Sequence, residues 1–186
     1  MRRTTLLILS ASAIALAGCG KKHEAEAPAV TVDVNNEVTT TAAPAVSPDQ
    51  TFANTAAASD AFEIGTSKLA LEKSSSSAIK AFATQMIKAH SESTAKLTTT
   101  AATLAPAIVP DATLSAEQQS VMDSLTAASG KDFDTAYAAA QVDAHQKALD
   151  ALKAYATDGA VPAFKDIATG LVPKVTAHLN MAKGLK

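Results

Sequence analysis

The chain has 186 residues, which is enough for one domain with a sizeable hydrophobic core. Its formal net charge of -2, from 16 basic and 18 acidic side chains, excludes a strongly basic nucleic-acid-binding protein. The chain has no tryptophan and is rich in alanine, serine and threonine, which favours helices that pack closely through small side chains.

The N-terminal segment has the pattern of a targeting signal. It opens with two arginines, continues with an apolar stretch over residues 6–16 that is too short to span a bilayer, and ends in the motif LAGC at residues 16–19. This motif resembles the lipobox of bacterial lipoproteins. The resemblance implies a signal peptide over residues 1–18, cleavage before Cys19 and attachment of lipid to Cys19. The alternative is an ordinary secretory signal with a chance cysteine.

The residues after the signal suggest where the anchored protein resides. In lipoproteins of this kind an aspartate directly after the cysteine favours the inner membrane, and here that residue is Gly20. The resemblance therefore implies the bacterial cell envelope, at the outer membrane facing the periplasm, with the membrane as a partner through the lipid on Cys19. Residues 19–46 lack a helical period, so we expect a flexible tether, with His23 solvated within it.

Residues 47–186 are predicted to form an all-α four-helix bundle with a short extra helix in the crossover. The first helix begins at Ser47, which suits the N-cap, and Gln50 occupies the position that reciprocates this cap. The face of small and apolar side chains that follows is interrupted by Glu63. We therefore expect a carboxylate in the core.

The second helix, residues 76–104, has the clearest helical period in the chain, and His90 lies in the middle of its apolar stripe. The connection that follows contains a short helix capped by Ser115. Gly130 is predicted to end this short helix.

The third long helix, which continues to about residue 157, carries three polar side chains on its inner face: Tyr137, Gln141 and His145. Buried polar groups are costly without partners, so other helices must supply them. Tyr137 and Gln141 lie within two turns before His145, where they could orient its ring or hold a bound water.

The last helix begins at Pro162 and places His178 inward. Gly170 and Pro173 are predicted to kink or interrupt it.

Three histidines and one glutamate therefore face the predicted core from four helices. At a rise of about 1.5 Å per residue, His145 and His178 lie at similar heights, whereas Glu63 and His90 differ by about one helical turn. Three imidazoles and a carboxylate suit zinc, iron, copper or manganese. We predict one such ion bound by Glu63, His90, His145 and His178. The alternative is a metal-free structural or interaction lipoprotein of the periplasm, whose histidines bond to carbonyl groups or to Tyr137.

Several short segments of the bundle carry a family resemblance. They are LAL at 69–71, FA at 82–83 with Met86 and His90, FDTAY at 133–137, His145, LVP at 171–173 and HL at 178–179. Together they resemble the bacterial "domain of unknown function 4142" family over about residues 52–182, which implies a ferritin-like fold. One departure is that Lys88 and Ala89 precede His90, where the family commonly has an aspartate.

Other chemistry has less support. Ferritin-like di-iron proteins use Glu-x-x-His pairs, but the residues three before the histidines are Ile87, Val142 and Val175. This pattern disfavours a di-iron oxidase or iron store and favours a mononuclear site. The sequence has no nucleophilic cysteine, phosphate loop or nucleophile elbow, so we do not predict an enzyme. Use of the metal with oxygen or peroxide stays open as a third possibility.

Overall fold

A computed structural model describes residues 46–185 of the chain. The predicted signal peptide, including the lipobox motif, and most of the predicted tether therefore lie outside the described residues, as do Cys19 and His23. All regular secondary structure in the described part is helical. Its helices are α1 (Pro48–Lys73), α2 (Ser77–Ala102), α3 (Ala116–Ala127), α4 (Gly130–Asp158) and α5 (Pro162–Lys183). None of these helices combines the length and the apolar character that crossing a membrane requires.

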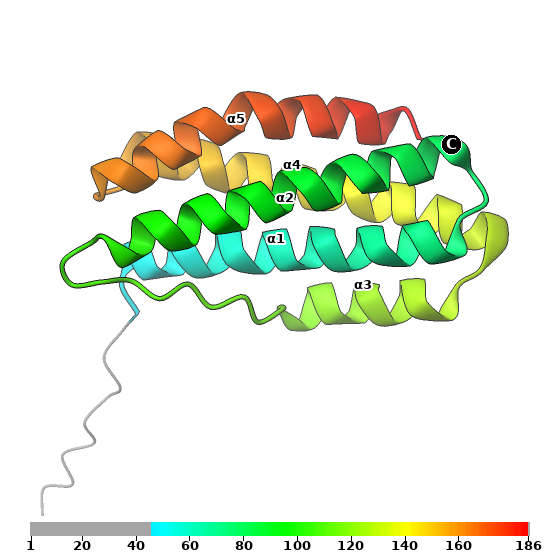
Figure 1. Ribbon diagram of the computed structural model, residues 1–186, viewed down its shortest axis with the longest axis horizontal. Helices are drawn as coiled ribbons and strands as arrows, with labels where there is room; N and C mark the ends of the chain where they lie inside the picture. The colour runs from blue at the N-terminus through cyan, green and yellow to red at the C-terminus, as the bar shows by residue number, and fades with distance from the viewer. Residues whose placement is uncertain (1–45, 186) are drawn as a thin grey trace, which may run out of the picture. The chain divides into compact units, whose positions relative to one another are not determined.

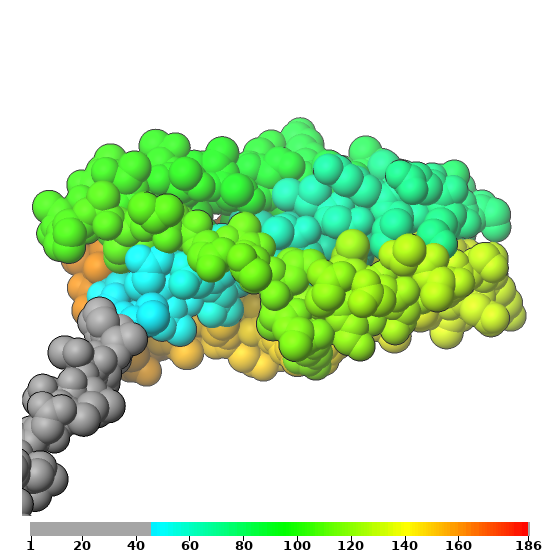
Figure 2. All heavy atoms as spheres, turned by 90° about the horizontal axis from the view of Figure 1, so that it is seen from below, coloured from blue at the N-terminus to red at the C-terminus, as the bar shows by residue number. Residues whose placement is uncertain are grey.

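The helices pack into a bundle of two antiparallel hairpins, α1–α2 and α4–α5 (Figure 1). The hairpins meet where α1 packs on α4 and α2 packs on α5. Helix α3 lies in the connection from α2 to α4 and packs on α1 and α4, so that the connection and α3 lie across part of one face of the bundle (Figure 2). The predictions of an all-helical fold and of a short helix in the crossover are confirmed.

The start of α1 differs in one contact from the predicted capping pattern. The Ser47 hydroxyl accepts a hydrogen bond of 3.1 Å from the main-chain nitrogen of Gln50, as expected for an N-cap. The Gln50 side chain, however, does not return to Ser47. Its Nε2 donates to the carbonyl of Val109 and to Oδ1 of Asn54, each at 2.7 Å. The predicted reciprocal cap is therefore wrong, because Gln50 ties α1 to the connection that follows α2.

The boundary between α3 and α4 also differs from the prediction. Ser115 and Gln118 form a reciprocal capping box at the start of α3, and α3 ends at Ala127. Gly130 does not end α3 but is the first residue of α4. Its φ of 55° lies in the left-handed region, which explains why glycine suits this position.

Helix α5 continues through Gly170 and Pro173, so the predicted interruption is wrong. A proline inside a helix removes one main-chain hydrogen bond. Burial of the apolar side chains on both sides of Pro173 offsets this loss, because Phe164 and Leu179 are 0% and 4% exposed.

The apolar core is divided into two clusters. One includes Phe52 and Phe164, and the other includes Phe82 and Phe133. Along α1, α2 and α4, buried polar residues lie between the members of the two clusters. The polar layer, as we call these residues together with the buried histidine of α5, comprises Asp60, Glu63, Thr66, Ser67, His90, Gln141, His145 and His178.

Candidate metal centre

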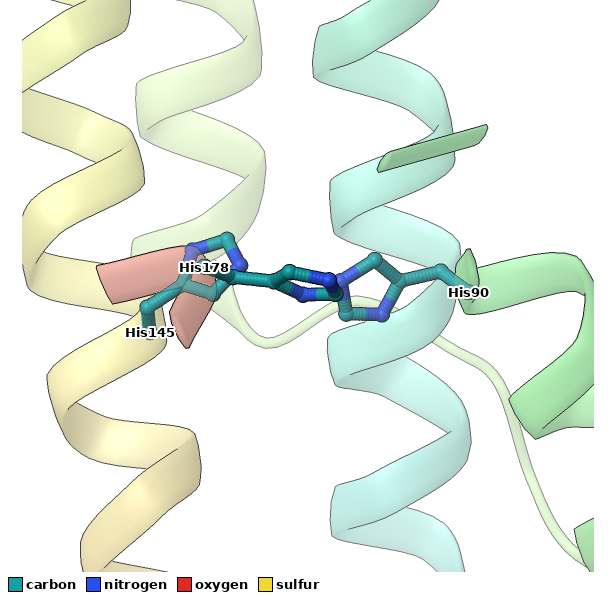
Figure 3. A group of neighbouring side chains, drawn as sticks. All are labelled: His90, His145 and His178. Atoms are coloured by element: carbon teal, nitrogen blue, oxygen red, sulfur yellow. The ribbon is translucent and has the colours of Figure 1, made fainter. Parts of the chain in front are cut away.

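Three histidines from three helices meet in the polar layer (Figure 3). The ring centroids of His90 and His145 are 5.7 Å apart, those of His90 and His178 are 5.9 Å apart, and those of His145 and His178 are 5.6 Å apart. One ring nitrogen of each histidine lies within 4.8 Å of one ring nitrogen of the others. The structure thus brings together the three histidines that helical periodicity placed in the core.

The ring of His90 is oriented by a carboxylate on the neighbouring helix. Its Nδ1 lies 2.8 Å from Oδ1 of Asp60 on α1, and the Thr94 hydroxyl donates to Oδ2 of the same carboxylate at 3.2 Å. Because a carboxylate only accepts hydrogen bonds, Nδ1 of His90 carries the proton. In the neutral ring, Nε2 then carries a free lone pair.

The ring of His145 is oriented by its own helix. Its Nδ1 donates to the main-chain carbonyl of Gln141 at 2.8 Å, so its Nε2 carries the lone pair when the ring is neutral. Metal-bound histidines in proteins usually donate their second ring N–H to a carboxylate or a carbonyl. His90 and His145 both show this arrangement.

Each of the three rings also has a buried nitrogen without a hydrogen-bond partner among the described residues. These atoms are Nε2 of His90, Nε2 of His145 and Nδ1 of His178. A buried polar atom without a partner destabilises a fold by about 1–3 kcal/mol. Three such nitrogens, one on each ring of the cluster, are atoms that a single bound ion would satisfy together.

Burial and neighbouring charges shift the pKa values of these histidines. Burial lowers the pKa of His145 and of His178 to about 4, so both rings are neutral at pH 7. Burial alone would also lower the pKa of His90, but the hydrogen bond that His90 donates to Asp60 and the charge of Glu63 raise it above its usual value.

Glu63 lies beside this group of three rather than within it. Its Oε1 is 3.5 Å from Nδ1 of His145, the nitrogen that already donates to the carbonyl of Gln141. Both carboxylate oxygens of Glu63 are buried and lack a partner in the described part of the chain. Burial raises the pKa of Glu63 to about 7, although the nearby His90 acts in the opposite direction.

Tyr137 and Gln141 have partners other than those expected. The hydroxyl of Tyr137 lies 3.0 Å from Oγ of Ser67 on α1. Nε2 of Gln141 donates to the Thr66 hydroxyl at 3.1 Å, so Gln141 reaches His145 through its main-chain carbonyl. Both side chains therefore join α4 to α1.

Asp60 is the residue of this site that sequence reasoning missed. A signal was present, because Asp60 lies three residues before Glu63 and hence one turn nearer to the level of His90. A carboxylate does accept a hydrogen bond from His90, but it belongs to Asp60 of α1. The positions next to His90 in sequence hold Lys88 and Ala89 instead.

One comparison with known proteins found a relationship. The model of a family described as "Domain of unknown function (DUF4142)" matches residues 35–185. The match begins within the predicted tether and includes every residue of the polar layer. No curated protein and no solved structure matches the chain.

Proposed function

This chain belongs to the family of the domain of unknown function DUF4142, and we propose that it binds one transition-metal ion through His90, His145 and His178. The observation that carries the proposal is the presence of three buried ring nitrogens without partners, one from each histidine, in a single cluster. An ion bound to all three would replace three unsatisfied atoms by three coordinate bonds.

The geometry of the cluster supports this assignment. In a four-coordinate site with metal–nitrogen distances of about 2.0–2.1 Å, two ligating nitrogens are about 3.3 Å apart. The ring nitrogens here lie within 4.8 Å of one another. Metal binding therefore requires the ligating nitrogens of any two rings to approach each other by about 1.5 Å at most. Small side-chain rotations provide such a movement.

The donor set restricts the choice of metal. Imidazole suits zinc, copper and iron, whereas magnesium and calcium prefer oxygen ligands. Three protein ligands leave at least one coordination position open. Manganese, which accepts oxygen more readily, becomes more favourable if Glu63 is a fourth ligand, as the sequence predicts.

Glu63 supports the proposal in either of two roles. As a ligand, its carboxylate would complete a four-coordinate site. Without direct coordination, its charge would still balance that of the ion, because a nearby cation favours the ionised carboxylate. Both roles predict weaker metal binding in Glu63→Gln.

The test is a measurement of bound metal on the mature chain with Cys19→Ser, purified without a polyhistidine tag. Inductively coupled plasma mass spectrometry should find about one equivalent of metal, lost in His145→Ala and retained in the control His23→Ala. No stoichiometric metal in the parent, or equal loading in His145→Ala, would contradict the proposal. That result would favour a metal-free structural or interaction lipoprotein.

The envelope location is a separate part of the proposal. The LAGC motif at residues 16–19 supports a lipid anchor on Cys19, and Gly20 supports the outer membrane. In a Gram-negative host the parent should fractionate with outer membranes. Cys19→Ala should lose the attached lipid in mass spectra, and a variant that still carries lipid would contradict this assignment.

We also assign the bundle to the ferritin-like class. Two long hairpins joined by a connection that holds its own short helix support this assignment. The histidine cluster departs from the di-iron sites of that class, since no histidine here has a glutamate three residues before it. The proposed centre is therefore mononuclear.

A further inference from the structure

A pocket of about 560 Å³ reaches the histidine cluster from one side. All four long helices contribute to its lining, and two of the three clustered histidines, His90 and His178, lie in its wall. His145 and Glu63 are not among its lining residues. The pocket therefore approaches the proposed metal from the edge formed by His90 and His178, and Glu63 lies on another side.

The wall of the pocket is mainly apolar, with Phe52, Leu152 and Val175 among its buried members. A pocket of this size and character suits a small organic molecule, since ligand pockets are about 300–1,000 Å³ and mostly apolar. Its only other buried ionisable residue is Asp60, which is already hydrogen-bonded to His90.

The exposed lining residues, which we call the mouth of the pocket, carry more positive than negative charge. Lys96 of α2 and Lys174 of α5 are exposed lining residues, and Glu92 is the one acidic residue among the exposed ones. Lys174 lies one helical turn before His178. A negatively charged group that enters here would pass a lysine before it reaches the histidines.

We propose that this pocket binds an organic carboxylate, whose carboxylate group occupies an open coordination position of the metal ion and whose apolar body lies against the pocket wall. This inference rests on the proposed function, because the ion supplies the main attraction for the carboxylate. The charge at the mouth, the apolar wall and the two histidines along the pocket all fit the same ligand.

Gly170 offers a way to close the pocket without changing a metal ligand. It lies in the lining on α5, and a Cβ atom added there would have no neighbour within 4 Å. Gly170→Ala is therefore a control that fits without strain. Gly170→Leu places a larger side chain at the mouth, and both variants replace a glycine inside a helix by a better helix former.

The experiment uses the mature Cys19→Ser protein loaded with Co²⁺, whose visible absorption responds to its ligands. Benzoate should produce a saturable spectral change, and the uncharged isostere benzamide should not. Gly170→Leu should weaken benzoate binding at least about tenfold, whereas Gly170→Ala should match the parent. Lys174→Gln should weaken it about two- to fivefold, the effect of an exposed charge pair, and the control Lys131→Gln should not.

The possible failures are distinguishable. If the Co²⁺ spectrum forms but benzoate leaves it unchanged, or benzamide binds equally well, the carboxylate pocket is wrong and the metal site stands. If Gly170→Leu binds Co²⁺ and benzoate as the parent does, the pocket is not the route and the inference is overturned. If no Co²⁺ binds to the parent, the proposed function fails and this inference fails with it. Should Gly170→Leu fail to fold, Lys174→Gln and benzamide still decide the outcome.

Discussion

Nδ1 of His90 and Oδ1 of Asp60 lie 2.8 Å apart, and this contact joins α2 to α1 at the level of the histidine cluster. Asp60 is only 5% exposed and is held in place from its other oxygen by Thr94. The contact fixes both the orientation of the His90 ring and the nitrogen that remains free. Helix α1 therefore positions one of the proposed metal ligands even though it contributes none of the three histidines.

Replacing Asp60 should weaken metal binding without removing a ligand. Asp60→Ala leaves Nδ1 of His90 without its acceptor, and loss of such a supporting carboxylate typically lowers metal affinity by about 10–100-fold. Asp60→Asn keeps an acceptor oxygen and should have a smaller effect. Competition against a chromophoric chelator measures the affinities, with Asp143→Ala as the exposed control. An unchanged affinity in Asp60→Ala would show that His90 does not depend on this contact.

Glu63→Gln should stabilise the metal-free protein at alkaline pH. Folding raises the pKa of Glu63 from 4.5 to about 7, so the folded state holds this proton more tightly than the unfolded chain. Ionising the buried carboxylate above pH 7 therefore costs folding free energy, whereas below pH 4.5 both states are protonated and the cost vanishes. The gain from Glu63→Gln should be about 3 kcal/mol larger at pH 8 than at pH 4.

Urea unfolding in the presence of a chelator measures this difference. Glu72→Gln, at an exposed position of the same helix, is the control and should show no comparable gain at alkaline pH. Equal effects of Glu63→Gln at both pH values would mean that the pKa of Glu63 in the folded protein stays near its unfolded value of 4.5.

The metal-free protein should lose stability as the pH falls from 6.5 to 4, because the lowered pKa values of His145 and His178 together outweigh the opposite contribution of Glu63. Burial lowers the pKa of His145 to about 4 from 6.5. Between these values the unfolded chain binds a proton that the folded chain does not, so acid favours unfolding. His145→Gln removes this group and should reduce the slope of unfolding free energy against pH by about 1.4 kcal/mol per pH unit in this range. The control His23→Gln should leave the slope unchanged. If His145→Gln also leaves it unchanged, another group takes up the proton that destabilises the folded chain.

Ser67 and Tyr137 should be energetically coupled. Their hydroxyl oxygens are 3.0 Å apart and both residues are 0% exposed. Ser67→Ala leaves the Tyr137 hydroxyl without its partner, which should cost about 1–3 kcal/mol of unfolding free energy. In the double variant with Tyr137→Phe no hydroxyl is left unsatisfied, so the total cost should be smaller than the sum of the single costs. Additive costs in urea unfolding would show that the contact contributes little.

Helical periodicity was sufficient to identify the three histidines, because burial on one face of a helix repeats about every 3.6 residues. Heights counted along the helices also indicated that Glu63 and His90 differ by about one turn. The structure accounts for this offset, since the carboxylate that meets His90 is Asp60, one turn before Glu63. Periodicity identified Glu63 but not Asp60, although the structure buries both acids.

Other features depended on contacts that local patterns do not contain. Gln50 bonds to Val109, which lies 59 positions away in sequence, so its capping role could not be read from neighbouring residues. Likewise, the tendency of Pro173 to break a helix was outweighed by burial of α5 against its neighbours. The pocket beside His178 also depends on how α2 and α5 pack, which the sequence of neither helix specifies.

The division of the polar layer between the two hairpins has a mechanical consequence. Asp60 and His90 belong to α1–α2, and His145 and His178 belong to α4–α5. Packing within each hairpin is more extensive than packing between hairpins. An ion bound by residues of both hairpins would therefore oppose the separation of α1–α2 from α4–α5. The two hairpins should part more readily after chelation, which would make the lifetime of the folded chain respond to the metal supply of its surroundings.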